Sequence, residues 1–270
     1  MSTADTFPKL LEENARLRGE KPSIREKNLG IWQSWSWQQV RGEVRAMAHG
    51  LAALGLKRGD RIAIIGDNRP QLYWGIVAAQ ALGAVPVPVY QDAVARELQF
   101  VLNHAEIRYA LAEDQEQVDK LLEVKDECPL LEQIVYDDPR GMRHYTQPFL
   151  HSLASVEAMG REHLKEHPDY YDEQMAQGVG SDTAIFLYTS GTTGSPKGVV
   201  LTFDNLISVS RMSVEMENLK EDEETLAYLP MAWVGDNIFT IGQSFVAGFC
   251  VNCPESGATV MQDLREVGPT

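Results

Sequence analysis

Apolar residues in the first half of the chain alternate between the spacing of a helix and short continuous runs. From Val40 to Leu54 they recur every three or four residues, which predicts one apolar face of an amphipathic helix. Ser36 and Gln39 stand at capping-box spacing just before this face, and Gly55 supplies a stop signal after it. The pattern therefore predicts a helix that begins after Ser36 and ends before Gly55.

The same alternation of helix and strand continues as far as residue 136. Asp67 or Asn68 is expected to cap the second helix, which has Pro70 in its first turn. Strands that alternate with helices of about a dozen residues predict parallel pairing and a layered α/β fold. The expected elements are the strand Arg61–Gly66, a helix ending near Leu82, the strand Ala84–Val89, the helix Ala93–His104, the strand Ile107–Ala112, the helix Gln115–Lys125 and the strand Gln133–Tyr136.

The alternation breaks between residues 137 and 181. One polar helix is expected here, at Ser152–His167, followed by a loop-like stretch from Asp169 to Ser181. We therefore divide the chain into a first α/β region (1–136), an irregular excursion (137–181) and a third region (182–270) in which strands resume.

Composition and charge narrow the class of protein. The chain has 270 residues, of which 44% are hydrophobic and 23% are charged, as in globular domains. The net charge of −15 argues against nucleic acid or an anionic membrane as the main partner, although a small phosphate-bearing ligand is compatible with it. The longest uncharged stretch, Gln71–Gln91, contains two prolines close together, so we expect a buried helix and strand instead of a membrane span. The N-terminus has no apolar run, so no signal peptide is expected.

Three cysteines are too few for a disulfide framework, which favours a reducing, cytoplasmic location. Cys250 and Cys253 form a C-x-x-C without a second pair, and we interpret them as buried strand cysteines. His163 and His167 match an inverted zinc-protease signature, but their segment is polar and has no evident third ligand. We interpret it as a solvated helix, and we expect His104 to be structural.

The segment richest in chemistry is Thr189–Gly198, which follows the apolar strand Ala184–Tyr188 and precedes the strand Val199–Thr202. Its ten residues contain five hydroxyls, three glycines and one lysine. Glycine lets backbone N–H groups approach an anion, hydroxyls bind phosphate oxygens or Mg²⁺, and Lys197 supplies a positive charge. A Walker loop is disfavoured because Lys197 is followed by glycine and a strand. A polyphosphate site and a plain Gly/Ser/Thr surface hairpin both remain open from composition alone. After this segment, Asp204 is expected to cap a helix from Asn205 to Glu217.

The full string of Tyr188–Gly198, YTSGTTGSPKG, resembles the phosphate-loop signature of the adenylate-forming superfamily. This superfamily contains acyl-CoA synthetases, peptide-synthetase adenylation domains and luciferases. Further segments resemble its other helix–strand units and its pocket segment: Trp35–Asn68, Ala78–Tyr90 and Tyr228–Trp233. Within the superfamily, the segments Gly30–Gln33 and Asp263–Thr270 look most like long-chain fatty acyl-CoA synthetases.

The resemblance implies a two-step reaction with ATP, Mg²⁺ and coenzyme A. A fatty acid carboxylate attacks the α-phosphorus of ATP to give acyl-adenylate and pyrophosphate, and the thiol of coenzyme A then displaces AMP. By position in the family motif, Thr192 would hold Mg²⁺. The residues that would bind the β- and γ-phosphates are Thr189, Ser190, Gly191, Thr193, Gly194 and Lys197. Trp233 and Val234 would line the acyl and nucleotide pocket, and core packing is an equal alternative for Trp233.

The resemblance also implies an incomplete, layered α/β/α N-terminal domain of the AMP-binding type, without the C-terminal domain. The family's adenine-binding and ribose-binding segments and its C-terminal lysine are not found in the sequence. We therefore expect the first part of a large domain that is inactive alone. A catalytically dead nucleotide-binding or interaction module remains an alternative, as does a ligase for another acid. The expected partners are small-molecule substrates and no nucleic acid, and peripheral membrane contact and oligomeric state stay open.

Overall fold

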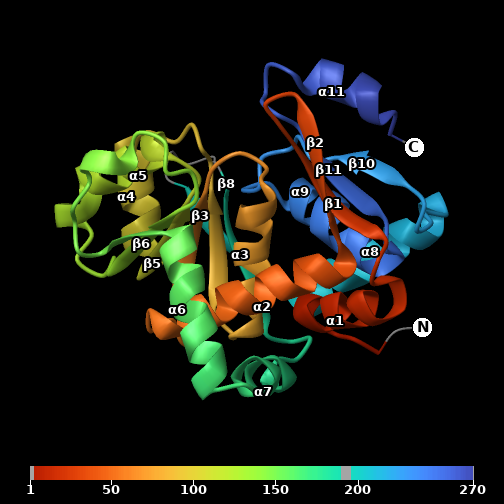
Figure 1. Ribbon diagram of the computed structural model, residues 1–270, viewed down its shortest axis with the longest axis horizontal. Coiled ribbons are helices and arrows are strands. Elements are labelled where there is room, and N and C mark those ends of the chain that lie inside the picture. The colour runs from red at the N-terminus through yellow and green to blue at the C-terminus, as the bar shows by residue number, and fades with distance from the viewer. Residues whose placement is uncertain (1–2, 190–195, 270) are drawn as a thin grey trace.

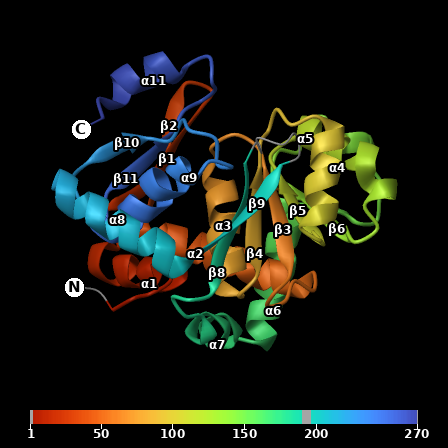
Figure 2. The same ribbon diagram turned by 180° about the vertical axis from the view of Figure 1, so that it is seen from behind.

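Three β-sheets and the helices between them make up the computed structural model, which describes residues 3–189 and 196–269 (Figure 1). The five-stranded sheet is parallel throughout, in the order β4 (Val85–Val89), β3 (Arg61–Ile65), β5 (Tyr109–Ala112), β6 (Gln133–Tyr136) and β7 (Leu150–Ser152). The four-stranded sheet has the order β10 (Glu224–Leu226), β11 (Cys250–Cys253), β1 (Pro22–Asn28) and β2 (Ile31–Ser36). A hairpin of β8 (Thr183–Thr189) and β9 (Lys197–Thr202) forms the third, and β8 lies beside β4 (Figure 2).

The helices fill the spaces between these sheets and cover them. The first group is α1 (Phe7–Arg18), α2 (Trp37–Ala53), α3 (Pro70–Ala81), α4 (Ala95–His104), α5 (Gln115–Val124), α6 (Leu153–Glu166) and α7 (Tyr170–Gln177). The second is α8 (Phe203–Glu217), α9 (Val234–Asp236), α10 (Gln243–Ala247) and α11 (Val260–Val267). Short turns lie at η1 (Lys125–Glu127), η2 (Met142–His144) and η3 (Asn237–Gly242), the last of which is π-helical.

The side-chain alternation of β3 explains the layers. Ile62 and Ile64 contribute to a core shared with α2 and α3, whereas Ala63 and Ile65 contribute to a second core with α4 and α5. Both faces of a parallel strand are covered in this way, which is why β3 reads as a continuous apolar run. The layered α/β fold and the parallel pairing predicted from the sequence are confirmed.

The predicted cap of α3 is wrong. Its N-cap is Arg69, which makes no side-chain capping hydrogen bond, and Pro70 follows it inside the helix. Proline in the first turn removes one of the four N–H groups that have no partner at a helix start. The Asn68 amide instead donates to the Tyr73 hydroxyl, at 2.6 Å, and so is used in tertiary packing. Asp67 uses its backbone N–H as a donor to the Glu113 carboxylate.

The cap predicted for α8 is also displaced. Thr202, two positions before Asp204, is the N-cap, and it forms a reciprocal capping box with Asn205. Asp204 lies in the first turn, where a carboxylate favours the helix dipole.

The stretch expected to be loop-like contains a helix. Within Asp169–Ser181, α7 forms, and Tyr171 is its one buried residue. The guanidinium of Arg45, from α2, lies 5.3 Å from the centre of the Tyr171 ring. A single buried ring leaves no periodic apolar pattern in the sequence, so this helix depends on packing against α2.

Two glycines allow α2 and α6 to touch at their backbones. A Cβ added to Gly50 would lie 2.5 Å from the Val156 carbonyl oxygen, and one added to Gly160 would lie 2.4 Å from that of Ala46. Both contacts are far inside van der Waals distance, so only glycine allows this approach.

The remaining sequence motifs have ordinary packing roles. His163 was expected on a solvated helix, yet its Nδ1 lies 2.8 Å from that of His49, which is fully buried on α2. Within residues 3–189 and 196–269, no group of three His, Cys, Asp or Glu side chains could hold a metal ion. Cys250 and Cys253 are free and buried on β11, as predicted. In the same two ranges, no helix combines the length and apolarity needed to cross a bilayer.

The glycine contact predicts opposite effects for two substitutions in one helix. Gly50→Ala should destabilise the fold by about 1 to 3 kcal/mol, the usual cost of overpacking, because α6 must move away. Gly42→Ala, on the open face of α2, should stabilise it by up to about 1 kcal/mol through helix propensity. Urea denaturation of both variants measures the difference, and equal effects would contradict the close-contact account.

The buried histidine predicts a dependence of stability on pH. Burial, together with His163 and Arg45, lowers the pKa of His49 to about 4. The unfolded chain binds this proton near the ordinary value of about 6.5, so stability is fully present above that pH and is lost as the pH falls towards 4. His49→Gln should flatten the fall in melting temperature over this range, whereas His144→Gln, at an exposed position, should leave it unchanged.

Candidate functional site

The ends of the predicted phosphate loop are held by the β8–β9 hairpin. Thr189 and Lys197 are paired across this hairpin, and both side chains are exposed. Gly198 follows, and a Cβ there would lie 2.1 Å from the Phe186 ring, so the strand needs glycine at this position. Of the residues between the two ends, Pro196 is described, whereas Ser190, Gly191, Thr192, Thr193, Gly194 and Ser195 lie outside the described residues.

A mainly apolar cavity of about 160 Å³ opens where β4 and β8 end. Its walls include Val89 at the end of β4, Tyr90 directly after it, Thr189 at the end of β8, and Ala232 from the second half of the chain. Ligands of open α/β sheets bind in crevices outside the carboxyl ends of strands. The hairpin therefore places Lys197, the partner of Thr189, next to a crevice of the expected kind.

The end of β8 is supported from α4. The Tyr188 hydroxyl lies 2.6 Å from Nδ1 of His104, and the ring of Phe100 stacks on His104. Burial raises the pKa of Tyr188 to about 12, so this phenol stays protonated at neutral pH. His104 thus has the structural environment that the sequence predicted for it.

The segment that resembles the family's pocket segment forms another part of the same wall. Met231 and Ala232 are buried, whereas Trp233 is 54% exposed and Val234 is 45% exposed. Core packing, the alternative considered for Trp233, is therefore wrong. Its backbone is nevertheless held, because the Asn237 amide donates to the Trp233 carbonyl at 2.8 Å and to that of Met231 at 3.0 Å.

Sequence analysis missed a buried carboxyl group next to this segment. Asp236 is 1% exposed and accepts hydrogen bonds from Tyr73, Thr240 and Asn68. Burial raises its pKa to about 7. A single aspartate before Asn237 was the sequence signal, and it did not reveal which donors would surround the carboxyl group.

A second cavity, of about 560 Å³, lies where β5 and β6 end and has the wrong charge for a polyphosphate. Its lining contains more carboxyl groups than cations, namely Glu26, Glu113, Asp137, Asp138 and Glu255 against Lys27, Arg69 and Arg140. Burial and the charges of Glu26 and Glu113 raise the pKa of Asp137 to about 7. Because carboxylates already repel one another here, an added anion is disfavoured.

A third cavity, of about 950 Å³, lies along α1 and the first part of α2. None of the described residues predicted to form the site lines it. Of these three cavities, the crevice beside Thr189 is the one that adjoins residues predicted to bind phosphate, and it is the candidate site.

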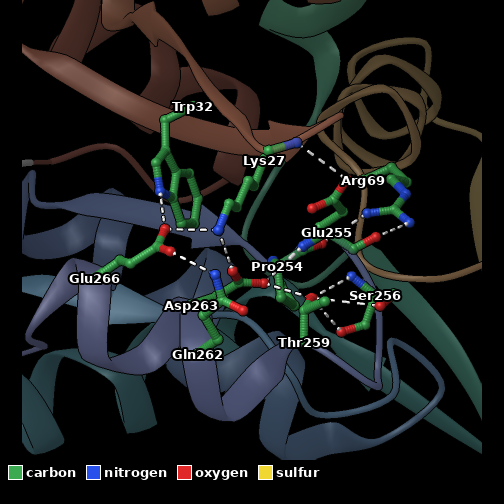
Figure 3. Close-up of polar contacts among 11 residues, drawn as sticks. Lys27, Trp32, Arg69, Pro254, Glu255, Ser256, Thr259, Gln262, Asp263 and Glu266 are labelled. Carbon is green, nitrogen blue, oxygen red and sulfur yellow. Dashed lines mark hydrogen bonds and ion pairs between the residues drawn. The ribbon is translucent and has the colours of Figure 1, made fainter.

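The two segments that resemble long-chain synthetases meet in the fold (Figure 3). Lys27, which is 4% exposed, donates to Asp263 at 2.8 Å and to Glu266 at 2.6 Å. Trp32 donates from its indole nitrogen to Glu266, which is 234 positions away in the sequence. The hydrogen bond from Lys27 contributes most to lowering the pKa of Glu266 to about 2. These contacts fasten α11 to the β1–β2 hairpin.

Comparison with known sequences gives one family and a consistent set of relatives. The profile of the family described as AMP-binding enzyme matches residues 11–270. The chain is 28% identical over 275 residues to the human long-chain-fatty-acid–CoA ligase ACSBG2, with 99% of the chain and 40% of that protein covered. It is 26% identical over 261 residues to ACSBG1 of Rattus norvegicus, with 93% of the chain and 35% of that protein covered. The chain thus spans less than half the length of these relatives.

Solved structures share the fold. An anthranilate CoA ligase, AuaEII, in complex with anthranoyl-AMP superposes with a TM-score of 0.84 at 20% identity, covering 100% of this chain and 49% of the other. A long-chain-fatty-acid-CoA ligase, FadD1, from Archaeoglobus fulgidus gives a TM-score of 0.82 at 17% identity, covering 100% of this chain and 51% of the other. At these identities the likeness concerns the fold.

Because the ion pair of Lys27 is buried, we expect Lys27 to contribute more to the stability of the fold than the exposed Lys21. Lys27→Met should lower the melting temperature clearly, because it leaves the fully buried Asp263 carboxylate without its cation. Lys21→Met is the matched control, since Lys21 is half exposed and pairs with Glu221 at the surface. Equal melting temperatures for the two variants would contradict the role given to Lys27.

Proposed function

The chain belongs to the AMP-binding enzyme family, and we propose that it forms the first part of the catalytic domain of an ATP-dependent long-chain fatty acid–CoA ligase. The proposed reaction joins a fatty acid to AMP with release of pyrophosphate, and then transfers the acyl group to the thiol of coenzyme A. The relatives named as long-chain-fatty-acid–CoA ligases support the substrate class, at 26% to 28% identity.

The observation that carries the proposal is where the two described ends of the hydroxyl- and glycine-rich segment lie. Thr189 and Lys197 bring its two ends to the mouth of the crevice beside β4. We assign the β- and γ-phosphates of ATP to these two residues and to four in the loop, Ser190, Gly191, Thr193 and Gly194. Lys197 would neutralise charge on the departing pyrophosphate, which is where electrostatic stabilisation is most effective.

The donor set of this loop fits a magnesium-bound triphosphate. Hydroxyl oxygens are hard ligands of the kind Mg²⁺ prefers, and the ion keeps several bonds to phosphate and water. Thr192 is the residue that we assign to it. Bound Mg²⁺ would supply further charge neutralisation, while the chain itself contributes the lysine and the backbone donors.

The apolar side of the crevice suits an acyl group. Ala232 lines the crevice, and the neighbouring Trp233 and Val234 present exposed apolar side chains. We propose that Trp233 and Val234 line the pocket for the acyl chain and the nucleotide. Burying such a surface against methylene groups would contribute about 0.8 kcal/mol per methylene.

Removal of the loop lysine tests the phosphate assignment. Lys197→Ala in the whole protein should weaken Mg·ATP binding about tenfold or more, the size expected when one charge-assisted hydrogen bond is lost. Lys220→Ala, at another exposed lysine, should leave the affinity unchanged. Isothermal titration measures binding, and pyrophosphate exchange with palmitate measures adenylation.

The outcomes separate the alternatives. Binding of Mg·ATP by the whole protein without exchange would favour a nucleotide-binding module over a ligase. An unchanged affinity in Lys197→Ala would remove the phosphate assignment.

A further inference from the structure

The Asp236 carboxyl group is buried among neutral donors. Its two oxygens each lie 3.0 Å from the Tyr73 hydroxyl, and one also accepts from Thr240 at 2.8 Å and from Asn68 at 3.2 Å. A buried carboxyl group is costly unless hydrogen bonds compensate its loss of water. Three donors provide that compensation here: Asn68 and Tyr73 from the β3–α3 region, and Thr240 one helical turn after Asp236.

These donors join the parallel sheet to the pocket wall. Asn68 follows β3, Tyr73 lies on α3 and Thr240 lies on η3. The Asn68 amide also donates to the Leu229 carbonyl oxygen at 2.9 Å, at the start of the segment that carries Trp233. The network therefore spans the space between the end of β3 and the residues around the crevice.

Two residues at the start of the π-helical turn hold the segment around Trp233 in place. Asp236 and Asn237 are consecutive, and both are nearly fully buried, at 1% and 2% exposure. The Asn237 amide donates to the Met231 and Trp233 carbonyl oxygens. The Asp236 carboxyl group accepts from Asn68 and Tyr73, which lie beside the parallel sheet. π-Helical turns often occur at functional sites, where they alter the direction of neighbouring side chains.

We propose that Asp236 is a positioning residue: its carboxyl group fixes the segment from Leu229 to Val234, and thereby sets how Trp233 is presented at the crevice. That an acyl chain contacts Trp233 rests on the proposed function, whereas the positioning of Trp233 by Asp236 does not. The carboxylate accepts from all its donors, but the protonated acid must itself donate, which forces the Tyr73 or Thr240 hydroxyl to turn.

We expect Asp236 to change its protonation near neutral pH. Burial raises the pKa of Asp236 to about 7, against the hydrogen bonds of its three donors, which favour the ionised form. The titratable groups that face it are Tyr73 on α3 and Cys253 on β11, and the pKa of each is raised well above its ordinary value by burial. Both therefore stay neutral while Asp236 titrates.

The fluorescence of Trp233 tests the coupling directly. The difference in emission between the parent protein and Trp233→Phe should titrate with a midpoint near 7. Asp236→Asn should abolish the titration, and Asp222→Asn, at an exposed acid, should leave it intact. A titration that persists in Asp236→Asn would overturn the proposal, as would its absence from the parent protein.

A second variant decides the matter if Asp236→Asn does not fold. Tyr73→Phe removes a donor to the ionised carboxyl group while keeping the ring, so the midpoint should rise by about one unit. An unchanged midpoint would contradict the network. In the active enzyme, Asp236→Asn should raise KM for the fatty acid and flatten its pH profile, while the Mg·ATP affinity stays the same. Failure of ATP binding would count against the proposed function alone, because the fluorescence titration needs no ligand.

Discussion

The burial of α3 between two sheets is the constraint on which the rest of this structure depends. Every residue of the helix after Gln71 is buried, and Figure 1 shows it between the parallel sheet and the four-stranded sheet. A helix that is apolar on all sides needs partners on all sides. Gly75 allows the closest of these contacts, since a Cβ there would lie 2.3 Å from the Leu111 side chain. Because α3 joins β3 to β4, this packing also fixes where those strands end.

The positions of the strand ends then decide which crevice suits an anion. The chain carries a net charge of −15, so its overall field repels phosphates. We propose that local donors offset this repulsion at the crevice beside β4 and β8, where Lys197 is paired with the lining residue Thr189. In the walls of the cavity beyond β5 and β6, carboxyl groups outnumber the cations, which disfavours an added anion. Affinity for a polyphosphate is thus a matter of a few donors within reach, since water and salt screen more distant charges.

Two buried polar clusters fasten distant parts of the chain in different ways. Lys27 joins α11 to the β1–β2 hairpin through ion pairs, whereas Asp236 joins η3 to α3 through neutral donors. A cation beside a carboxylate keeps it ionised over the ordinary pH range. Neutral donors compensate the same burial less completely, which leaves the Asp236 carboxyl group able to change its protonation near neutral pH.

The sequence by itself determined the alternation of helices and strands, because a helix or strand that buries one face has apolar residues at the regular spacing of that face. The bounds of β6 and the capping box at Ser36 follow from local chemistry, and the strand–loop–strand arrangement around Lys197 follows from composition. Only the tertiary structure decided which polar groups have partners far along the chain. The Asn68 side chain donates to Tyr73 and Leu229 instead of capping the helix, and the packing of Tyr171 stabilises α7. Local pattern does not encode the contact of Asn68 with Leu229 or that of Tyr171 with α2, since each depends on a surface formed by residues distant in sequence.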